Sequence, residues 1–246
     1  RHGLRVIEDA AHALPCTWQG ELIDSLDSDI TVYSFYATKT LATGEGGMVV
    51  TRDPALAKRC RVMRLHGIDR DAFDRFTSKK PAWYYEIVAP GFKYNLPDTA
   101  AAMGRVQLAR VRAMRDRRAD IAGEYDRAFA SLPVVLPPCP ERLAGRGYDA
   151  NDTHAWHLYV LRLAPEAPIG RDEFIVRMTE TGIGCSVHYV PLHLQPYWRD
   201  RYGLQPTMFP HSQAAYECMV SLPIYSRMSD GETARVMHAV DSLLRA

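Results

Sequence analysis

The sequence lacks the features that place proteins in membranes or on nucleic acids. None of its apolar runs approaches the roughly 18 residues that a membrane span needs. Thirty Lys and Arg residues against 29 Asp and Glu residues give a formal net charge of +1, which removes the electrostatic argument for a nucleic acid or a membrane surface as partner. With 246 residues, 47% of them hydrophobic, the chain is long enough to bury a sizeable core. We therefore expect an ordinary soluble globular protein.

Cysteine is scarce and irregularly placed. The five cysteines are odd in number and widely spread, and no two of them form a C-x-x-C pair. This pattern is not that of a disulfide framework or a zinc knuckle. Unpaired thiols suit a reducing compartment, so we expect a cytoplasmic location.

The start of the sequence has neither an initiator methionine nor the apolar stretch of a signal peptide. Residues 4–8 already have the pattern of a strand. We therefore expect that an N-terminal portion of the protein precedes this sequence.

Short apolar runs alternate with turn residues in the first half of the chain. We predict strands at residues 4–8, 30–35 and 47–51. A helix should follow from Pro54 to about residue 65, with Asp53 as its N-cap. This alternation is typical of an α/β fold.

The next segment, residues 67–92, lacks periodicity and predicts a long ordered loop. Asp98 is then expected to cap a helix that bends and continues past residue 118 to residue 129. We assign residues 1–118 to the remainder of a large sheet domain.

Prolines and glycines between residues 133 and 147 break the pattern before a second α/β region. We place a small C-terminal domain at residues 119–246. Its closing helix should begin after Ser229, whose spacing to Glu232 is that of a capping box. The other elements that we predict are strands at residues 156–163 and 185–189 and helices at residues 171–181 and 212–218.

Two acids and a histidine follow an apolar strand at Glu8, Asp9 and His12. Ligand sites in open α/β sheets favour the carboxyl ends of strands. Neighbouring strand residues point to opposite faces, so only one of the two acids faces a ligand, and we choose Asp9. By residue type alone, an acid here also suits a helix cap or a metal ligand.

A single lysine, Lys39, follows the strand predicted at residues 30–35. Partial burial lowers the pKa of a lysine, and the neutral amine is the form that attacks a carbonyl group. Taken alone, Lys39 has the context of a surface lysine. Together with the carboxylate of Asp9 and the hydroxyl of Ser34, it suits pyridoxal phosphate, which needs an amine for its aldehyde, an acid for its ring nitrogen and donors for its phosphate.

The order of these motifs resembles that of the sugar aminotransferases of the DegT family. The first matching stretches are Glu-Asp-Ala-Ala-His at residues 8–12, Ser-Phe-Tyr-Ala-Thr-Lys at residues 34–39, Glu-Gly-Gly at residues 45–47 and His-Gly at residues 66–67. Later matches lie at residues 90–98, 154–159, 182–184 and 221–223. The resemblance covers essentially the whole chain and implies an α/β, fold-type-I enzyme that uses pyridoxal 5'-phosphate. Within the family, the chain is most similar to the UDP-4-amino-4-deoxy-L-arabinose aminotransferases.

The resemblance also implies a role for each matching residue. Lys39 would bond covalently to the cofactor and move a proton, and Asp9 would contact the pyridine nitrogen. Ser34 would bind the phosphate, and His12 would lie against the ring. Asn95 matches an asparagine that reaches the cofactor phosphate of the partner subunit, which implies a homodimer with shared active sites. From its sequence context alone, Asn95 is a turn residue.

Two histidines three residues apart, His154 and His157, raise the alternative of a metal site. We expect no metal there, because residues three apart on a strand face opposite ways and no third ligand is apparent nearby. Instead, we predict that these two histidines line the substrate site.

The resemblance implies transamination of a nucleotide-linked 4-keto sugar with glutamate as amino donor, in the synthesis of amino sugars for cell-surface polysaccharide. Three alternatives stay open. The first is a non-catalytic or truncated relative with a sensing or assembly role. The second is a pyridoxal-phosphate-dependent sugar dehydratase, although those relatives carry histidine in place of Lys39. The third is a cofactor-free lyase that uses Lys39 alone.

Overall fold

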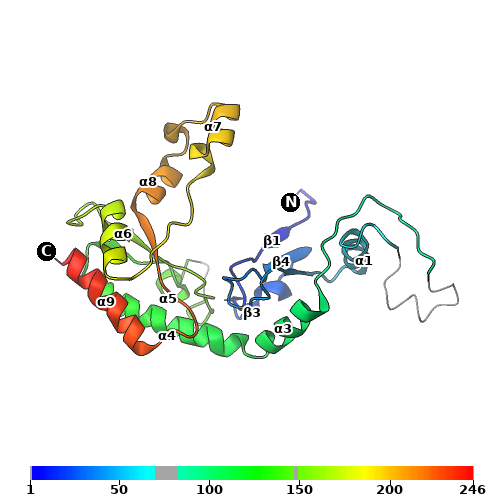
Figure 1. The fold of residues 1–246 in the computed structure, drawn as a ribbon, viewed down its shortest axis with the longest axis horizontal. Coiled ribbons are helices and arrows are strands. Elements are labelled where there is room, and N and C mark those ends of the chain that lie inside the picture. Colours follow the sequence, from blue (N-terminus) through cyan, green and yellow to red (C-terminus); the bar gives the residue numbers. More distant parts are fainter. Residues whose placement is uncertain (1, 70–82, 147–148, 246) are drawn as a thin grey trace. The chain divides into compact units, whose positions relative to one another are not determined.

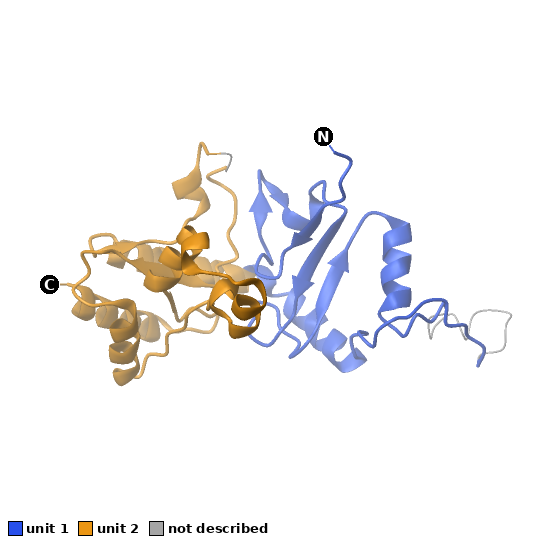
Figure 2. Cartoon of the chain, turned by 90° about the horizontal axis from the view of Figure 1, so that it is seen from above, with its two compact units in different colours: residues 1–112 blue, residues 113–246 orange. Residues whose placement is uncertain are grey.

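The computed structural model describes residues 2–69, 83–146 and 149–245. The chain divides into two compact units, Arg1–Arg112 and Ala113–Ala246 (Figure 2). The division falls near the start of a long helix, α4 (Val111–Phe129). Within the described residues, no helix is long and apolar enough to cross a membrane.

The first unit contains a three-stranded sheet in the order β1-β4-β5. β1 (Ile7–Asp9) pairs in parallel with β4 (Ile30–Ser34), which pairs antiparallel with β5 (Gly47–Val50). These are the three strands predicted for this half of the chain, although β1 begins at Ile7 and not at residue 4. Between β1 and β4 the chain forms a short ribbon and a 3₁₀ turn: β2 (Thr17–Trp18), β3 (Glu21–Leu22) and η1 (Ile23–Ser25).

The helix predicted after β5 is confirmed as α1 (Pro54–Met63). Its predicted cap is confirmed too, because the Asp53 carboxylate accepts hydrogen bonds from the backbone N–H groups of Ala55 (2.8 Å) and Leu56 (3.3 Å). Two of the first orphan N–H groups of the helix are thereby satisfied.

The bent helix is confirmed as α3 (Asp98–Leu108) followed by α4. The predicted cap of α3 is wrong. Pro97 is the N-cap residue, without a side-chain hydrogen bond, and Asp98 is the first helical residue. An acid in the first turn still interacts favourably with the positive end of the helix dipole, which explains why the sequence signal resembles a cap.

The loop predicted at residues 67–92 lies partly outside the described residues. Its two described ends are joined by isolated bridges, one of which pairs Ile68 with Ile87. Gly67 has a φ of +72°, and an added Cβ would lie 1.7 Å from the carbonyl oxygen of Ala89. Only glycine fits where these two backbone segments cross.

The second unit contains an antiparallel sheet in the order β6-β7-β8 together with helices (Figure 1). Its strands are β6 (Val134–Val135), β7 (Tyr159–Leu163) and β8 (Met219–Leu222). Besides α4, its helices are α5 (Pro140–Leu143), α6 (Arg171–Glu180), η2 (Leu192–Leu194), α7 (Pro196–Tyr202), η3 (Pro206–Met208), α8 (Pro210–Cys218) and α9 (Asp230–Leu244). The helices predicted at residues 171–181 and 212–218 and after Ser229 are confirmed, and the Ser229–Glu232 capping box is present.

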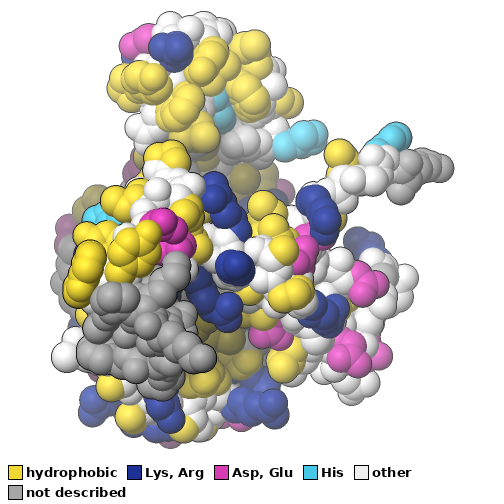
Figure 3. All heavy atoms as spheres, turned by 90° about the vertical axis from the view of Figure 1, so that its right-hand side faces the viewer, with side chains coloured by type: hydrophobic (Ala, Val, Ile, Leu, Met, Phe, Trp, Pro, Cys, Tyr) yellow, Lys and Arg dark blue, Asp and Glu magenta, His cyan; other side chains and the backbone are white. Residues whose placement is uncertain are grey.

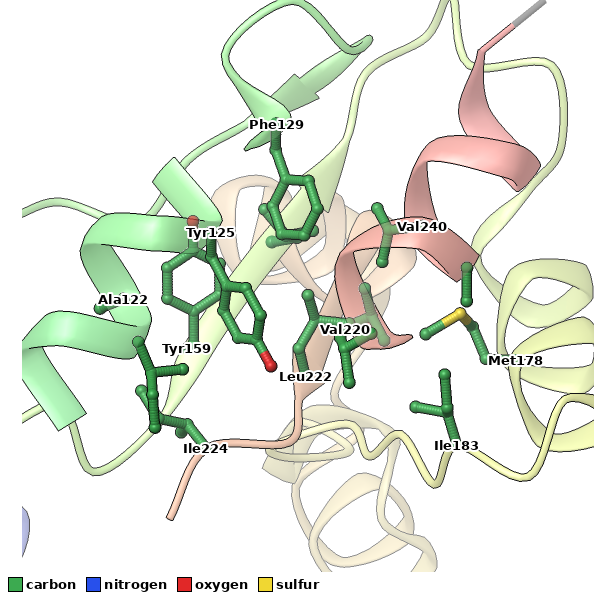
Figure 4. Packing of buried hydrophobic residues seen from close by; sticks show 14 of the residues in the cluster. Ala122, Tyr125, Phe129, Tyr159, Met178, Ile183, Val220, Leu222, Ile224 and Val240 are labelled. Atoms are coloured by element: carbon green, nitrogen blue, oxygen red, sulfur yellow. The ribbon is translucent and has the colours of Figure 1, made fainter. Parts of the chain in front are cut away.

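The core of the second unit is built from the inner faces of α4, β7, β8, α6 and α9 (Figure 4). Tyr125 and Phe129 from α4 pack against Tyr159 of β7, with ring centroids 5.0 to 6.4 Å apart. All three side chains are fully buried. Burial of each such ring stabilises the fold by about 1.5–3 kcal/mol.

Two strand predictions in this unit need correction. β7 begins at Tyr159, not at residue 156, because Trp156 has a φ of +47° and cannot continue an extended strand. No strand forms at residues 185–189. That segment makes a single bridge, Ser186 to Ser221, on the edge of β8 that β7 does not occupy.

Candidate active site

Lys39 lies in the loop of residues 35–46, which connects β4 to β5. The base of this loop is closed by Phe35, whose N–H donates to the Gly46 carbonyl (2.8 Å) and whose carbonyl accepts from the Thr43 N–H (2.8 Å). The Lys39 N–H donates to the Tyr36 carbonyl at 2.9 Å. The lysine is therefore held on an ordered turn.

Close packing fixes the second half of this loop. Gly46 has a φ of +151°, and an added Cβ would lie 2.7 Å from the Thr43 hydroxyl and 2.8 Å from Leu96. An added Cβ at Gly47 would lie 2.6 Å from the carbonyl oxygen of Tyr33. The Gly-Gly pair therefore allows the loop to return to β5 against its own base.

The register of β1 on β4 separates the two neighbouring acids. Glu8 lies opposite Thr31, and Asp9 lies opposite Val32. The Glu8 carboxylate accepts hydrogen bonds from the hydroxyls of Thr31 (2.9 Å) and Ser28 (2.7 Å). Because neighbouring strand residues face opposite sides, Asp9 projects from the other face of the sheet, the face that Val32 shares.

Asp9 and Lys39 interact electrostatically. Partial burial lowers the pKa of the Lys39 amine, and the negative charge of Asp9 offsets part of this decrease. The end of β1 and the loop after β4 thus bring a carboxylate and a partly desolvated amine within reach of each other. Ser34, the last residue of β4, is on the Val32 face, and its hydroxyl accepts from the Tyr36 N–H at 3.3 Å.

This donor set suits pyridoxal phosphate. Lys39 offers an amine whose lowered pKa favours the reactive neutral form, and Asp9 offers an acid for a cationic ring nitrogen. Ser34 offers a hydroxyl for a phosphate. His12 is exposed and lies in the turn after β1, three residues beyond Asp9.

Asn95 is placed differently. It lines a groove of about 990 Å³ between β5, α1 and residues 92–98, which Lys39, Asp9 and Ser34 do not line. Its side-chain oxygen accepts a hydrogen bond from the Lys93 ammonium group. The structure therefore places Asp9 where its charge acts on Lys39, with Ser34 on the same sheet face as Asp9, and leaves Asn95 in a groove that none of the three lines.

Basic side chains lie on α1 and at its C-cap. Lys58, Arg61 and Arg64 are exposed, and Figure 3, which faces the side of the molecule where α1 lies in Figure 1, shows basic side chains among hydrophobic ones. Arg61 and Arg64 also line the groove of Asn95, whereas Lys58 does not.

The predicted histidines lie in the second unit, in a turn before β7. The Nδ1 atom of His154 accepts from the Trp156 N–H at 3.1 Å, and the two rings meet edge to face. Burial lowers the pKa of His154. The prediction that His154 and His157 project from opposite faces of a strand is wrong, because this segment is not a strand. Within the described residues, no three His, Cys, Asp or Glu side chains gather to hold a metal ion.

Sequence reasoning missed Arg118, which contacts the turn of His154 and His157. Only 4% of this residue is exposed. A signal was present, because Arg118 lies on the same helical stripe as the buried Ile121, Ala122 and Tyr125. A charge on an apolar stripe indicates a buried polar role.

Comparisons with known proteins identify the family of this chain. The sequence matches the DegT/DnrJ/EryC1/StrS aminotransferase family over residues 1–241. The spore coat polysaccharide biosynthesis protein SpsC of Bacillus subtilis (strain 168) is 42% identical over 246 residues, which are 99% of this chain and 61% of SpsC. The chain thus spans less than two thirds of the length of this curated relative.

Solved structures show the same fold. Spr1654 from Streptococcus pneumoniae, named as a candidate sugar aminotransferase and solved in its PMP-form, superposes with a TM-score of 0.84 at 29% identity, over 98% of this chain and 59% of that one. DesV from S. venezuelae, in complex with a ketimine intermediate, gives a TM-score of 0.82 at 30% identity, over 100% of this chain and 59% of that one. The motif resemblance is confirmed, and the chain belongs to the DegT/DnrJ/EryC1/StrS aminotransferase family.

Proposed function

We propose that this chain forms part of a pyridoxal-phosphate-dependent aminotransferase that transfers the amino group of glutamate to a nucleotide-linked 4-keto sugar. The observation that carries the proposal is the parallel pairing of β1 with β4, which sets Asp9 at the end of one strand beside the loop that holds Lys39 after the other. Family membership supports the reaction class. The S. pneumoniae relative, solved in PMP- and PLP-forms, supports the cofactor.

Each residue of the site has a task in this proposal. The bound cofactor supplies an aldehyde for covalent attachment and an electron-withdrawing ring that stabilises negative charge on the neighbouring carbon. Lys39 would hold the cofactor covalently and, as a free amine, would move a proton during amino transfer. Asp9 would keep the ring nitrogen protonated, Ser34 would bind the phosphate, and His12 would lie against the ring.

The proposal also covers the oligomeric state, the domain division, the cellular location and the biological role. Asn95 would reach the cofactor phosphate of a second copy, in a homodimer with shared sites. Residues 1–118 would belong to the cofactor-binding domain and residues 119–246 to the small domain. A cytoplasmic location is supported by the pattern of the five cysteines, which are odd in number and contain no C-x-x-C pair. The name of SpsC, a spore coat polysaccharide biosynthesis protein, supports a role in polysaccharide synthesis, and we place the amino sugar product there.

Absorption spectroscopy tests the reaction class. The longest natural form of the protein that contains this chain, mixed with pyridoxal phosphate, should show a visible band from lysine-bound cofactor, and glutamate should bleach it. Lys39→Ala should lack the band, whereas Lys58→Ala, which removes an exposed lysine of α1, should keep it. A flat spectrum with the unsubstituted protein would reject the proposal.

The substrate requires a separate assay. A panel of nucleotide-linked 4-keto sugars, each offered with glutamate, identifies the acceptor by the amino sugar formed. Shared sites are tested by mixing Lys39→Ala subunits with Asn95→Ala subunits. Partial recovery of activity supports a site built from two copies, and no recovery argues for self-contained subunits.

A further inference from the structure

A buried arginine on α4 has no task in the proposed reaction. The Nη1 atom of Arg118 donates to the carbonyl oxygens of Trp156 (3.1 Å), His157 (3.3 Å) and Ile224 (2.9 Å). In the described part of the chain, no carboxylate forms a salt bridge with it. Burial of a guanidinium that has only carbonyl partners carries a large desolvation penalty. A role in positioning the segments that it contacts accounts for its presence better than stability alone.

The three carbonyls belong to two segments that leave the sheet at the same end. β7 begins and β8 ends in a paired position, Tyr159 opposite Leu222. The turn before β7 and the segment after β8 therefore meet beside α4. Arg118 ties both segments to the helix through their main chains.

The turn before β7 has an unusual backbone conformation that these hydrogen bonds stabilise. Trp156 has a φ of +47°, a conformation that residues other than glycine rarely adopt. Its ring is 7% exposed and stacks on Tyr159 with centroids 5.9 Å apart. The hydrogen bond from Arg118 holds the carbonyl of the same residue, so the ring and the backbone of Trp156 are both fixed.

The fixed backbone in turn determines which ring nitrogen of His154 carries the proton in the neutral form. The Trp156 N–H donates to Nδ1 of His154 at 3.1 Å. An accepting Nδ1 carries no proton, so the neutral ring carries its proton on Nε2. Burial lowers the pKa of this ring, and the charge of Glu141 on α5 offsets part of that decrease.

We propose that Arg118 is a positioning residue that, through the backbone of Trp156, holds Nδ1 of His154 as a hydrogen-bond acceptor and so leaves Nε2–H as the donor. The recipient of that hydrogen bond would be an oxygen of the sugar nucleotide, and this part rests on the proposed function.

Nuclear magnetic resonance of ¹⁵N-histidine-labelled protein tests the proposal without any activity. The signals of His154 are assigned with a His154→Gln variant. The unsubstituted protein should show the Nε2–H form of His154, with a titration midpoint below the ordinary value of 6.5. In Arg118→Met, His154 should populate both neutral forms, and its midpoint should rise toward 6.5.

The neighbouring arginine provides a matched control. Arg117 donates to the carbonyl of Met228 and to the Asp230 carboxylate, not to the turn before β7. Arg117→Met should therefore leave His154 unchanged. If Arg118→Met does not fold, Arg118→Lys, which keeps the charge but loses the forked donor, provides the comparison. An Nδ1–H form in the unsubstituted protein, or unchanged His154 signals in a folded Arg118 variant, overturns the proposal.

Kinetics separate this inference from the proposed function. In an active protein, Arg118→Lys should raise KM for the sugar nucleotide by roughly tenfold, the effect of about one hydrogen bond, with less change in KM for glutamate. If no transamination is found while His154 responds to Arg118 as expected, the substrate role is rejected and the positioning role stands. If transamination is found and His154 does not respond, the positioning role is rejected and the proposed function stands.

Discussion

The two units bury their apolar residues to different extents. Among the described residues, the core of the second unit contains 21 buried residues, whereas that of the first unit contains five. In the first unit only β4 alternates between buried and half-buried positions, while β1 and β5 are mostly exposed and carry apolar residues such as Ile7 (66% exposed) and Met48 (48%).

This difference bears on where the candidate site lies. Lys39 and its loop rest on the small core of the first unit, to which Phe35 and Leu41 belong. The geometry of the lysine therefore depends on few buried side chains and on local hydrogen bonds. The turn of His154, by contrast, is attached to the large core through Trp156. We expect the first unit to respond to local backbone changes and the second to respond to loss of core volume.

The largest effect should follow from a cavity in the second unit. Phe129→Ala removes a fully buried ring that packs on Tyr125 and Tyr159. We expect a loss of about 3–5 kcal/mol in the free energy of unfolding, measured by urea denaturation. The matched change in the first unit is Leu41→Ala, at a side chain that is 2% exposed. If Leu41→Ala costs more than Phe129→Ala, the ranking of the two cores is wrong.

A smaller effect should follow from a methyl group added to the Lys39 loop. Gly46→Ala places a Cβ against Thr43 and Leu96 at a positive φ, which should destabilise the loop by about 2–3 kcal/mol. Limited proteolysis of the loop measures the change. Gly44→Ala is the control, because Gly44 has a φ of +83° but no atom within 4 Å of an added Cβ. It should cost about 1 kcal/mol from backbone strain alone, and equal losses at both positions would argue against the close contact.

Removing a helix cap should reduce the free energy of unfolding by less than either change above. Its structural effect should differ between the two units. Asp53→Ala and Ser229→Ala each remove an N-cap hydrogen bond, worth about 1 kcal/mol. α1 has no buried residue, whereas α9 buries five, including Val236 and Leu244. Hydrogen exchange should therefore show fraying of α1 in the first variant and an intact α9 in the second. Fraying of α9 to the same extent would mean that its packing contributes little.

The sequence predicted most elements because their signals are local. Asp53 and the Ser229–Glu232 box are read directly from residue types at helix starts, and the alternation in residues 30–35 identifies β4. The errors arose where tertiary contacts decide the backbone. The positive φ of Trp156 depends on the buried Arg118 and on ring packing, and no local pattern reports either. Likewise, residues 185–189 have a strand-like pattern but make only one bridge.

The strand-end positions in the candidate site were predictable from local patterns, whereas the groove of Asn95 was not. Asp9 ends β1 and Lys39 follows β4, and these two adjacent parallel strands bring such positions to the same edge of the sheet. The separation of Glu8 from Asp9 follows from strand alternation. The groove around Asn95 depends on how residues 92–98 lie against β5 and α1, which periodicity does not encode.

The smallest effect should fall on a single titrating group. In Asp9→Asn the negative charge that raises the pKa of Lys39 is absent, while the burial that lowers it remains. The pKa of Lys39, already below its ordinary value of 10.5, should therefore decrease further. At any pH below that pKa, a larger fraction of the amine is neutral, so reductive alkylation of Lys39 should begin at a lower pH than in the unsubstituted protein. Peptide mass spectrometry across a pH series measures the labelled fraction.

A second variant makes this result specific to the Asp9–Lys39 pair. Glu8→Gln removes the neighbouring charge, whose carboxylate is engaged with Thr31 and Ser28 on the opposite face of the sheet. It should shift the labelling of Lys39 less than Asp9→Asn does. If Glu8→Gln shifts it more, Asp9 is not the acid that acts on the lysine, and the assignment of Asp9 to the cofactor ring fails with it. If neither shifts it, the amine is governed by burial alone, and the first unit holds Lys39 without an acidic partner.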